Sequence, residues 1–105
     1  MREPDADKLD YTLATDGPLF DRYVIHMNNG AKKYAPRNWM KAATQEELDR
    51  FVTSAFRHFM QWYYGEVDED HAAAVIFNMN GAELVREKLG PLGQHPRPKS
   101  VDWNA

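Results

Sequence analysis

The chain has 105 residues and a formal net charge of −3, and it contains no cysteine. A chain of this length forms one domain with a small core. The acidic balance argues against a general duplex-DNA binder, which needs a basic face. The absence of cysteine excludes disulfides and thiolate metal sites. No run of about 18 apolar residues is present, so no membrane span is expected. We therefore expect a cytoplasmic protein.

Residues 1–16 are acidic and rich in turn formers, and they are interpreted as an extended lead-in. A helix is predicted from Pro18 to about Tyr34, because apolar residues recur there at intervals of four, three and four. Pro36 disfavours a helical conformation in the residue before it and so ends the helix. The apolar stripe comprises Phe20, Val24, Met27 and Ala31.

A second helix is predicted from Thr44 to Gly65. Thr44 and Glu47 have the spacing of a capping box, and Gly65 is a natural C-terminal stop. The stripe at intervals of four and three is the widest in the chain, which places this helix at the centre of the core. It comprises Leu48, Val52, Ala55, Phe59 and Trp62.

A third helix is predicted from about Asp68 to Leu89, with Gly81 in its interior as a kink or a tight contact. Residues 90–105 are interpreted as a polar tail, which leaves 17–89 as the helical domain. The fold class is therefore all-α, a bundle of three long helices plus a short turn around 39–41. Because so small a bundle has little core of its own, we expect a homodimer.

The segment GAKKYAPRNW at 30–39 combines cationic and aromatic side chains. Lysines can neutralise phosphate, aromatic rings can stack on a base, and an amide can read its edge. The alternative is that lysines at a helix C-terminus only complement the helix dipole. The candidate nucleotide-binding residues here are Lys32, Lys33, Tyr34, Asn38 and Trp39.

The junction between the second and third helices carries carboxylates followed by a histidine. Carboxylates with water and phosphate suit Mg²⁺, and a histidine shifts the preference toward Mn²⁺. Acids at a helix N-terminus also complement its dipole, so a purely structural role stays open. The candidate metal ligands are Glu66, Asp70 and His71.

Three further polar residues lie on the helices near this junction. Arg57 can contact a phosphate through two N–H groups, or it can be an ordinary surface arginine. His58 lies at the edge of the apolar stripe, as a metal ligand or as a structural histidine. Asn78 is expected to be partly buried and to need hydrogen-bond partners, in a polar site or on a loop carbonyl across the bundle.

The segments GAKKYAPRNW and RHFMQWYYGE, followed by His71 and by Asn78 seven residues later, resemble a phage-associated family. It is the family of N-terminal domains of dATP/dGTP diphosphohydrolases, related to MazG-like all-α nucleotide pyrophosphohydrolases. The resemblance covers roughly residues 10–83. Two departures are present: the acidic connection before His71 is short, and Ala74 replaces a second histidine that is common in the family.

The resemblance implies metal-dependent cleavage of a nucleoside triphosphate to the monophosphate and pyrophosphate, in host cytoplasm if the protein is phage-encoded. Glu66 and His71 are then the catalytic candidates, with Mg²⁺ or Mn²⁺ as cofactor and a nucleotide as partner. Lys32, Lys33 and Arg57 would neutralise phosphate charge. The two departures favour an alternative, a nucleotide-sequestering protein without turnover. A second alternative is a small helical module that docks a protein partner.

Overall fold

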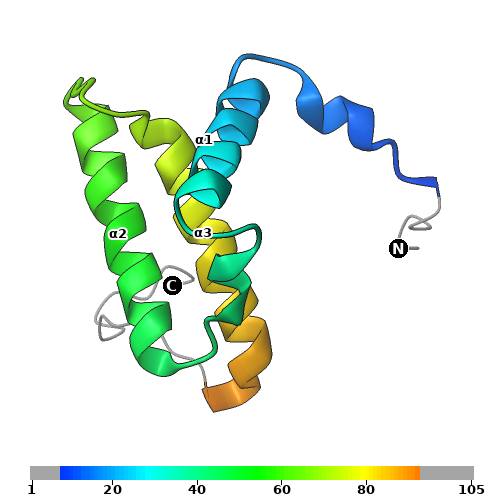
Figure 1. The fold of residues 1–105 in the computed structure, drawn as a ribbon, viewed down its shortest axis with the longest axis vertical. Coiled ribbons are helices and arrows are strands. Elements are labelled where there is room, and N and C mark those ends of the chain that lie inside the picture. The colour runs from blue at the N-terminus through cyan, green and yellow to red at the C-terminus, as the bar shows by residue number, and fades with distance from the viewer. Residues whose placement is uncertain (1–7, 93–105) are drawn as a thin grey trace, which may run out of the picture.

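The computed structural model describes residues 8–92, and this part is all-α and contains no strand (Figure 1). The predicted fold class is therefore confirmed for these residues. No helix in this range is long and apolar enough to cross a membrane. In chain order the elements are η2 (Tyr11–Thr15), α1 (Leu19–Lys33), η3 (Asn38–Lys41), α2 (Gln45–Tyr63), α3 (His71–Leu89) and η4 (Gly90–Leu92), where η denotes a 3-10 helix.

The helices α2 and α3 form an antiparallel hairpin, and α1 lies against α3 (Figure 1). The short η3 also packs on α3. In contrast, η2 extends away from the helical body. The lead-in predicted for 1–16 therefore contains one helical turn among its described residues, and Asp10 caps this turn by accepting from the amide of Thr12 at 3.0 Å. The predicted turn at 39–41 is confirmed as η3.

The predicted ends of α2 are confirmed. Thr44 Oγ1 accepts from the amide of Glu47 at 3.2 Å, and Glu47 Oε1 accepts from the amide of Thr44 at 3.1 Å. This reciprocal pair satisfies two amides that have no partner within the helix. After the helix, Gly65 adopts φ +79°, the left-handed conformation that glycine allows without strain.

Helix α3 begins at His71, three residues later than predicted. The carboxylate of Asp70 accepts from the amide of Ala73 at 3.1 Å and so forms the N-cap. Asp68 and Glu69 consequently remain in the turn that joins α2 to α3. This shift matters for the site, because turn residues can direct their carboxylates back toward α2.

The core lies between α2, α3 and the segment after η3. Its buried apolar side chains are Ala42, Leu48, Ala82 and Val85, with Phe51, Val52 and Leu89 packed against them. The predicted stripes are only partly buried. On α1, Phe20 and Val24 are each 41% exposed, and on α2, Phe59 and Trp62 are 45% and 53% exposed. Periodicity finds the apolar face of a helix, but it does not supply a partner for the whole face.

The side of α1 that contacts α3 includes polar residues that do not belong to the predicted apolar stripe. Arg22 forms an ion pair with Asp70, and the ring of His26 lies 5.5 Å from that of Phe77. Nδ2 of Asn80 in α3 donates to the hydroxyl oxygen of Tyr23 at 3.5 Å, which is a long hydrogen bond. Helix α1 is thus attached through a mixed polar and aromatic contact, so it contributes no buried residue to the core.

Candidate functional site

Two histidines from facing helices form the centre of the site. Nδ1 of His58 in α2 lies 2.8 Å from Nδ1 of His71, the first residue of α3. Both side chains are buried, with relative exposures of 6% and 2%. A buried imidazole needs partners for both nitrogens, so the remaining nitrogen of each ring is informative.

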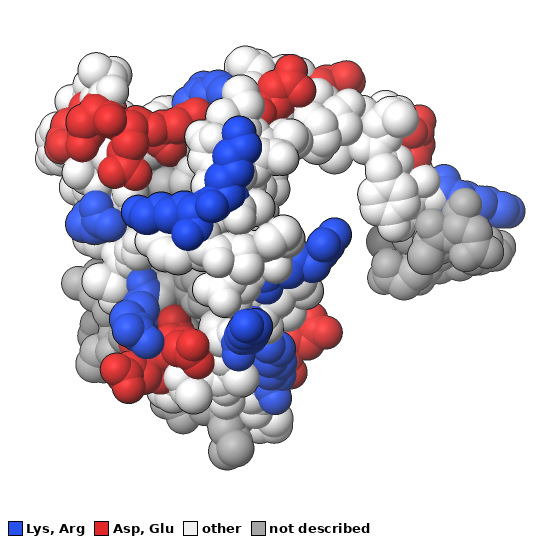
Figure 2. Space-filling model, viewed as in Figure 1, with Lys and Arg blue, Asp and Glu red and all other residues white. Residues whose placement is uncertain are grey.

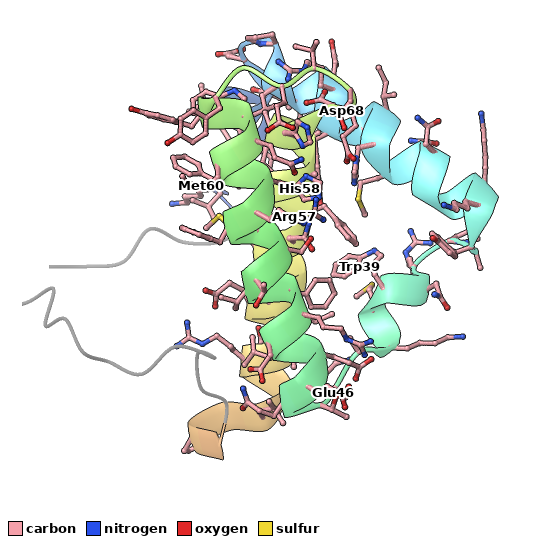
Figure 3. All side chains as sticks on the ribbon, turned by 90° about the vertical axis from the view of Figure 1, so that its left-hand side faces the viewer. Trp39, Glu46, Arg57, His58, Met60 and Asp68 are labelled. Carbon is pink, nitrogen blue, oxygen red and sulfur yellow. The ribbon has the colours of Figure 1, made fainter. Side chains whose placement is uncertain are left out.

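Each remaining nitrogen has a polar neighbour. Nε2 of His71 lies 2.7 Å from Oδ1 of Asp68 in the turn. Nε2 of His58 lies 3.3 Å from Nη2 of the adjacent Arg57. The histidine pair therefore connects a carboxylate at the α2–α3 turn to an arginine on α2. Figure 3 shows Asp68, His58 and Arg57 one below another along the side of α2 that faces α1 and η3.

The surroundings shift the protonation of two of these groups. Burial, followed by the positive charge of Arg57, lowers the pKa of His58 below its usual range. The hydrogen bond with His71 lowers the pKa of Asp68. Both shifts favour a neutral His58 and an ionised Asp68 near neutral pH.

Two overlapping groups of side chains bring potential metal ligands together. One consists of His58, Glu69 and His71, and the other of Glu66, Asp68 and His71; in each, the ligand atoms lie within 4.8 Å of one another. A set of two imidazoles and one carboxylate suits Mn²⁺ better than Mg²⁺, which favours oxygen ligands. The donor types therefore fit a divalent cation, with His71 common to both groups.

The structure gives Asp70 a different environment from the other predicted ligands. Its two carboxylate oxygens accept from Nε and Nη2 of Arg22 at 2.8 and 2.7 Å, and the side chain also caps α3. Arg22 is the main reason that the pKa of Asp70 falls to about 2. Asp70 belongs to neither metal group among the described residues. Its carboxylate is instead used to attach α1 to the start of α3.

A cavity of about 790 Å³ lies between η3 and the side of α2 that runs from Glu46 to Arg57. Four predicted nucleotide-binding residues contribute to its wall: Asn38, Trp39, Arg57 and Asn78. Arg57 is the important member, because the same guanidinium contacts His58. This residue places the histidine pair at one end of the larger cavity.

A second cavity of about 450 Å³ lies between the end of α1 and η3. Lys33, Tyr34, Asn38 and Trp39 line it. Because Asn38 and Trp39 line both cavities, the two spaces meet at η3. The indole of Trp39 is held edge-on to Phe77 at 5.9 Å between ring centroids.

Within one chain, the lysine pair at the C-terminal end of α1 lies away from the acidic α2–α3 turn. Arg22 marks where α1 reaches the turn, and Lys32 lies ten residues further along the helix, which corresponds to about 15 Å. Lys32 lines neither of the two cavities. Figure 2 shows carboxylates over the α2–α3 turn and basic side chains below them on the same face. Arg57, rather than the lysine pair, makes the direct connection.

Asn78 is buried, with 7% exposure. Its Nδ2 donates to the carbonyl of Ala74 on its own helix at 2.8 Å, not to a loop carbonyl across the bundle. The residue also lines the larger cavity. Its amide is thus held in place by the helix at the wall of the cavity.

Sequence reasoning did not select several residues of this region. Glu69 and Asp68 were recognised as acids of the junction but not chosen as ligands, and Phe77 was not noted. For the two acids, the available signal was their position two and three residues before His71. Which of the clustered acids turns toward the histidines depends on the N-cap at Asp70, and the helix start was predicted too early.

The comparisons with known proteins give one result. The chain matches the family described as dATP/dGTP diphosphohydrolase, N-terminal, over residues 2–87. No curated protein and no solved structure matches the chain. The matched range includes every element from η2 to α2 and nearly all of α3, and therefore every site residue described above. The chain belongs to the family of dATP/dGTP diphosphohydrolase N-terminal domains.

Proposed function

We propose that this domain cleaves a purine deoxynucleoside triphosphate to the monophosphate and pyrophosphate with a divalent cation. The observation that carries the proposal is the double role of Arg57. Its guanidinium contacts His58 of the histidine pair and also lines the larger cavity beside Trp39. A phosphate chain in that cavity would therefore lie next to the candidate metal ligands.

The cation would be held by His71 with either His58 and Glu69 or Glu66 and Asp68. When bound, it supplies charge neutralisation for the phosphates and a more acidic water molecule. The mixed nitrogen and oxygen donors favour Mn²⁺, with Mg²⁺ as the alternative when the carboxylate group is used. Glu66 and His71 remain the proposed catalytic residues.

The nucleotide itself would be held by residues of the two cavities. Trp39 or Tyr34 offers a flat ring for the base, and Asn38 offers an amide for its edge. Arg57 and Lys33 supply positive charge for the phosphates, a role that remains a prediction for Lys32 as well. Asn78, fixed by its bond to Ala74, would present its free acceptor at the cavity wall.

The direct test is to incubate the protein with dATP or dGTP and Mn²⁺ or Mg²⁺ and to separate the products by anion-exchange chromatography. We expect monophosphate and pyrophosphate in equal amounts from the wild-type protein. Glu66→Gln should lose turnover and keep its helical content. Glu87→Gln removes the same charge from the far end of α3 and serves as the control. Full activity of Glu66→Gln would remove Glu66 from the catalytic role.

A second candidate function is nucleotide binding without turnover. The observation that favours it is the engagement of Asp70 by Arg22, which takes one carboxylate away from the junction. In the same incubation this function predicts intact triphosphate, together with a rise in melting temperature on adding nucleotide. Formation of monophosphate and pyrophosphate by the wild-type protein would exclude binding without turnover.

We also propose that the domain pairs with a second copy through the exposed aromatic face of α2. Phe59 and Trp62 are half exposed, and their rings lie 5.7 Å apart. Among the described residues, Leu48 and Val85 are the only large side chains that are fully buried, so the core of one copy is small. The same face would suit the remaining alternative, a module that docks another protein. That alternative predicts no thermal response to nucleotides.

A further inference from the structure

The contacts of Arg57 determine where the protons of the histidine pair lie. A guanidinium only donates hydrogen bonds, so Nε2 of His58 must accept from Nη2 of Arg57. A neutral His58 then carries its proton on Nδ1, which donates to Nδ1 of His71 at 2.8 Å. His71 in turn carries its proton on Nε2 and donates it to Asp68 at 2.7 Å. The hydrogen bonds thus run in one direction, from Arg57 to Asp68.

A cation bound by the group of His58, Glu69 and His71 would reverse the tautomer of His58. In that group Nδ1 of His58 is the nitrogen nearest to Glu69, at 3.8 Å. A ligating nitrogen offers its lone pair and carries no proton. The proton of His58 would therefore move to Nε2, the atom that faces Arg57.

A cation bound by the group of Glu66, Asp68 and His71 would also move the proton of His58 to Nε2, by a different route. Nε2 of His71 is the nitrogen that faces Asp68, so ligation there moves the His71 proton to Nδ1. This N–H would then donate to Nδ1 of His58, since that atom is its neighbour at 2.8 Å. His58 would again carry its own proton on Nε2. The outcome does not depend on which group holds the cation.

We propose that metal loading turns the guanidinium of Arg57 away from His58 and into the larger cavity. With an N–H on Nε2 of His58, two donors would face each other at 3.3 Å, and the existing hydrogen bond would be lost. The guanidinium keeps a second bond, from Nη1 to Oε1 of Gln61 at 3.0 Å. Arg57 also already lines the cavity.

The consequence is a fixed order of events at the site, and it rests on the proposed metal-dependent function. In the metal-free protein Arg57 is held by His58. Once the cation is in place, the guanidinium is available to bind a phosphate through two N–H groups. Arg57 would thus make nucleotide binding depend on the loaded metal site.

The first test reads the protons directly. Long-range ¹⁵N NMR of the imidazole rings distinguishes protonated from bare ring nitrogens, with Zn²⁺ alone as a diamagnetic probe. We expect Nε2 of His58 to be bare in the metal-free protein and protonated after Zn²⁺ is added. A protonated Nε2 before addition, or a bare Nε2 afterwards, would overturn the inference.

The second test measures the competition between Arg57 and the cation. Arg57→Met removes the donor that favours the metal-free tautomer, so its Mn²⁺ affinity, measured by electron paramagnetic resonance, should rise roughly two- to tenfold, the net effect of one hydrogen bond. Arg50→Met removes an equal charge from the wall of the same cavity without touching His58 and is the matched control. Arg57→Lys keeps a donor and should stay near the wild-type affinity.

The outcomes separate this inference from the proposed function. If Arg57→Met and Arg50→Met change Mn²⁺ affinity equally, the effect is one of charge alone, and the inference is wrong while the metal site stands. If the wild-type protein binds neither Mn²⁺ nor Zn²⁺, the metal-dependent function and the inference both fail.

Discussion

The ammonium group of Lys88, near the end of α3, donates to the main-chain carbonyl of Met40 at 2.6 Å and to that of Ala42 at 2.8 Å. These carbonyls belong to η3 and to the residue after it, 48 and 46 positions earlier in the chain. A short 3-10 helix has little stability of its own. Lys88 therefore connects the segment that carries Trp39 to the α2–α3 hairpin.

Replacing Lys88 by methionine should loosen η3 without unfolding the hairpin. We expect a loss of about 1 kcal/mol in unfolding free energy, because two hydrogen bonds to a charged donor disappear at a partly exposed site. Hydrogen exchange should accelerate at the amides of Met40 and Ala42, which bond to carbonyls of Arg37 and Trp39. Lys41→Met, which removes a charge from η3 itself, is the control. Unchanged exchange in Lys88→Met would show that η3 is held by other contacts.

Gly81 should not tolerate a larger residue. A Cβ at this position would lie 2.6 Å from Cζ and 2.8 Å from Cδ1 of the Phe51 ring. The ring would have to move within the core, so Gly81→Ala should destabilise the protein by about 1–3 kcal/mol, as overpacking does. Gly30 in α1 has no atom within 4 Å of the same added Cβ. Gly30→Ala should instead stabilise by about 0.5–1 kcal/mol, because it reduces the freedom of the unfolded chain.

Urea denaturation of the two glycine variants checks this pair of expectations. The opposite signs are the useful part of the test, since both substitutions add the same methyl group inside a helix. Stabilisation by Gly81→Ala would mean that Phe51 does not pack against α3 as described.

The ion pair of Asp70 with Arg22 predicts a pH-dependent contribution to stability. The pKa of Asp70 falls from 3.8 to about 2 in the folded state, so the ionised carboxylate stabilises the folded protein relative to the unfolded chain. The contribution is complete above about pH 4 and is lost as the pH falls toward 2. We expect about 1 kcal/mol, discounted for the exposure of the pair to solvent.

Asp70→Asn isolates this contribution, because asparagine also caps a helix well. Denaturation of wild type and variant in EDTA should show a stability gap at pH 6 that closes between about pH 4 and pH 2. A gap that stays constant over this range would indicate that the cap, rather than the ion pair, is the source of the difference.

Trp39 should account for a large part of nucleotide affinity. Stacking of a base on an aromatic ring contributes about 1–3 kcal/mol, so Trp39→Ala should weaken dATP binding roughly five- to 150-fold in calorimetry with a catalytically inactive background such as Glu66→Gln. Trp39→Phe keeps a ring against Phe77 and should lose much less. Equal affinity of the alanine variant and its parent would place the base elsewhere.

If α2 is an interface between two copies, a charge on its exposed aromatic face should separate them. Phe59→Glu should shift the mass measured by light scattering from dimer to monomer, because burying an unpaired carboxylate is costly. Thr53→Glu, at an exposed position on the cavity side of the same helix, is the control. A wild-type protein that is monomeric at high concentration would exclude the pairing.

Local signals in the sequence predicted the helical elements well. The Thr44–Glu47 capping box, the stop at Gly65 and the turn around Trp39 depend on neighbouring residues, and all three are present. The start of α3 was predicted too early, since an acidic run offers several possible caps and Asp70 is the one whose carboxylate accepts from a first-turn amide of the helix. At Gly81 the sequence left a kink or a tight contact open, and the structure shows the tight contact, with Phe51 as the partner.

The site shows the same division more sharply. Composition and spacing identified His58, His71 and Arg57 as chemically interesting residues, because their side-chain types carry that information. The hydrogen bond between the two histidines could not be predicted from the sequence, because His58 and His71 are 13 positions apart and come together only when α3 packs against α2. The pairing of Asp70 with Arg22 spans 48 positions and likewise could not be read from spacing. Side-chain chemistry is a local property of the chain, whereas proximity across helices follows from packing, which depends on every element at once.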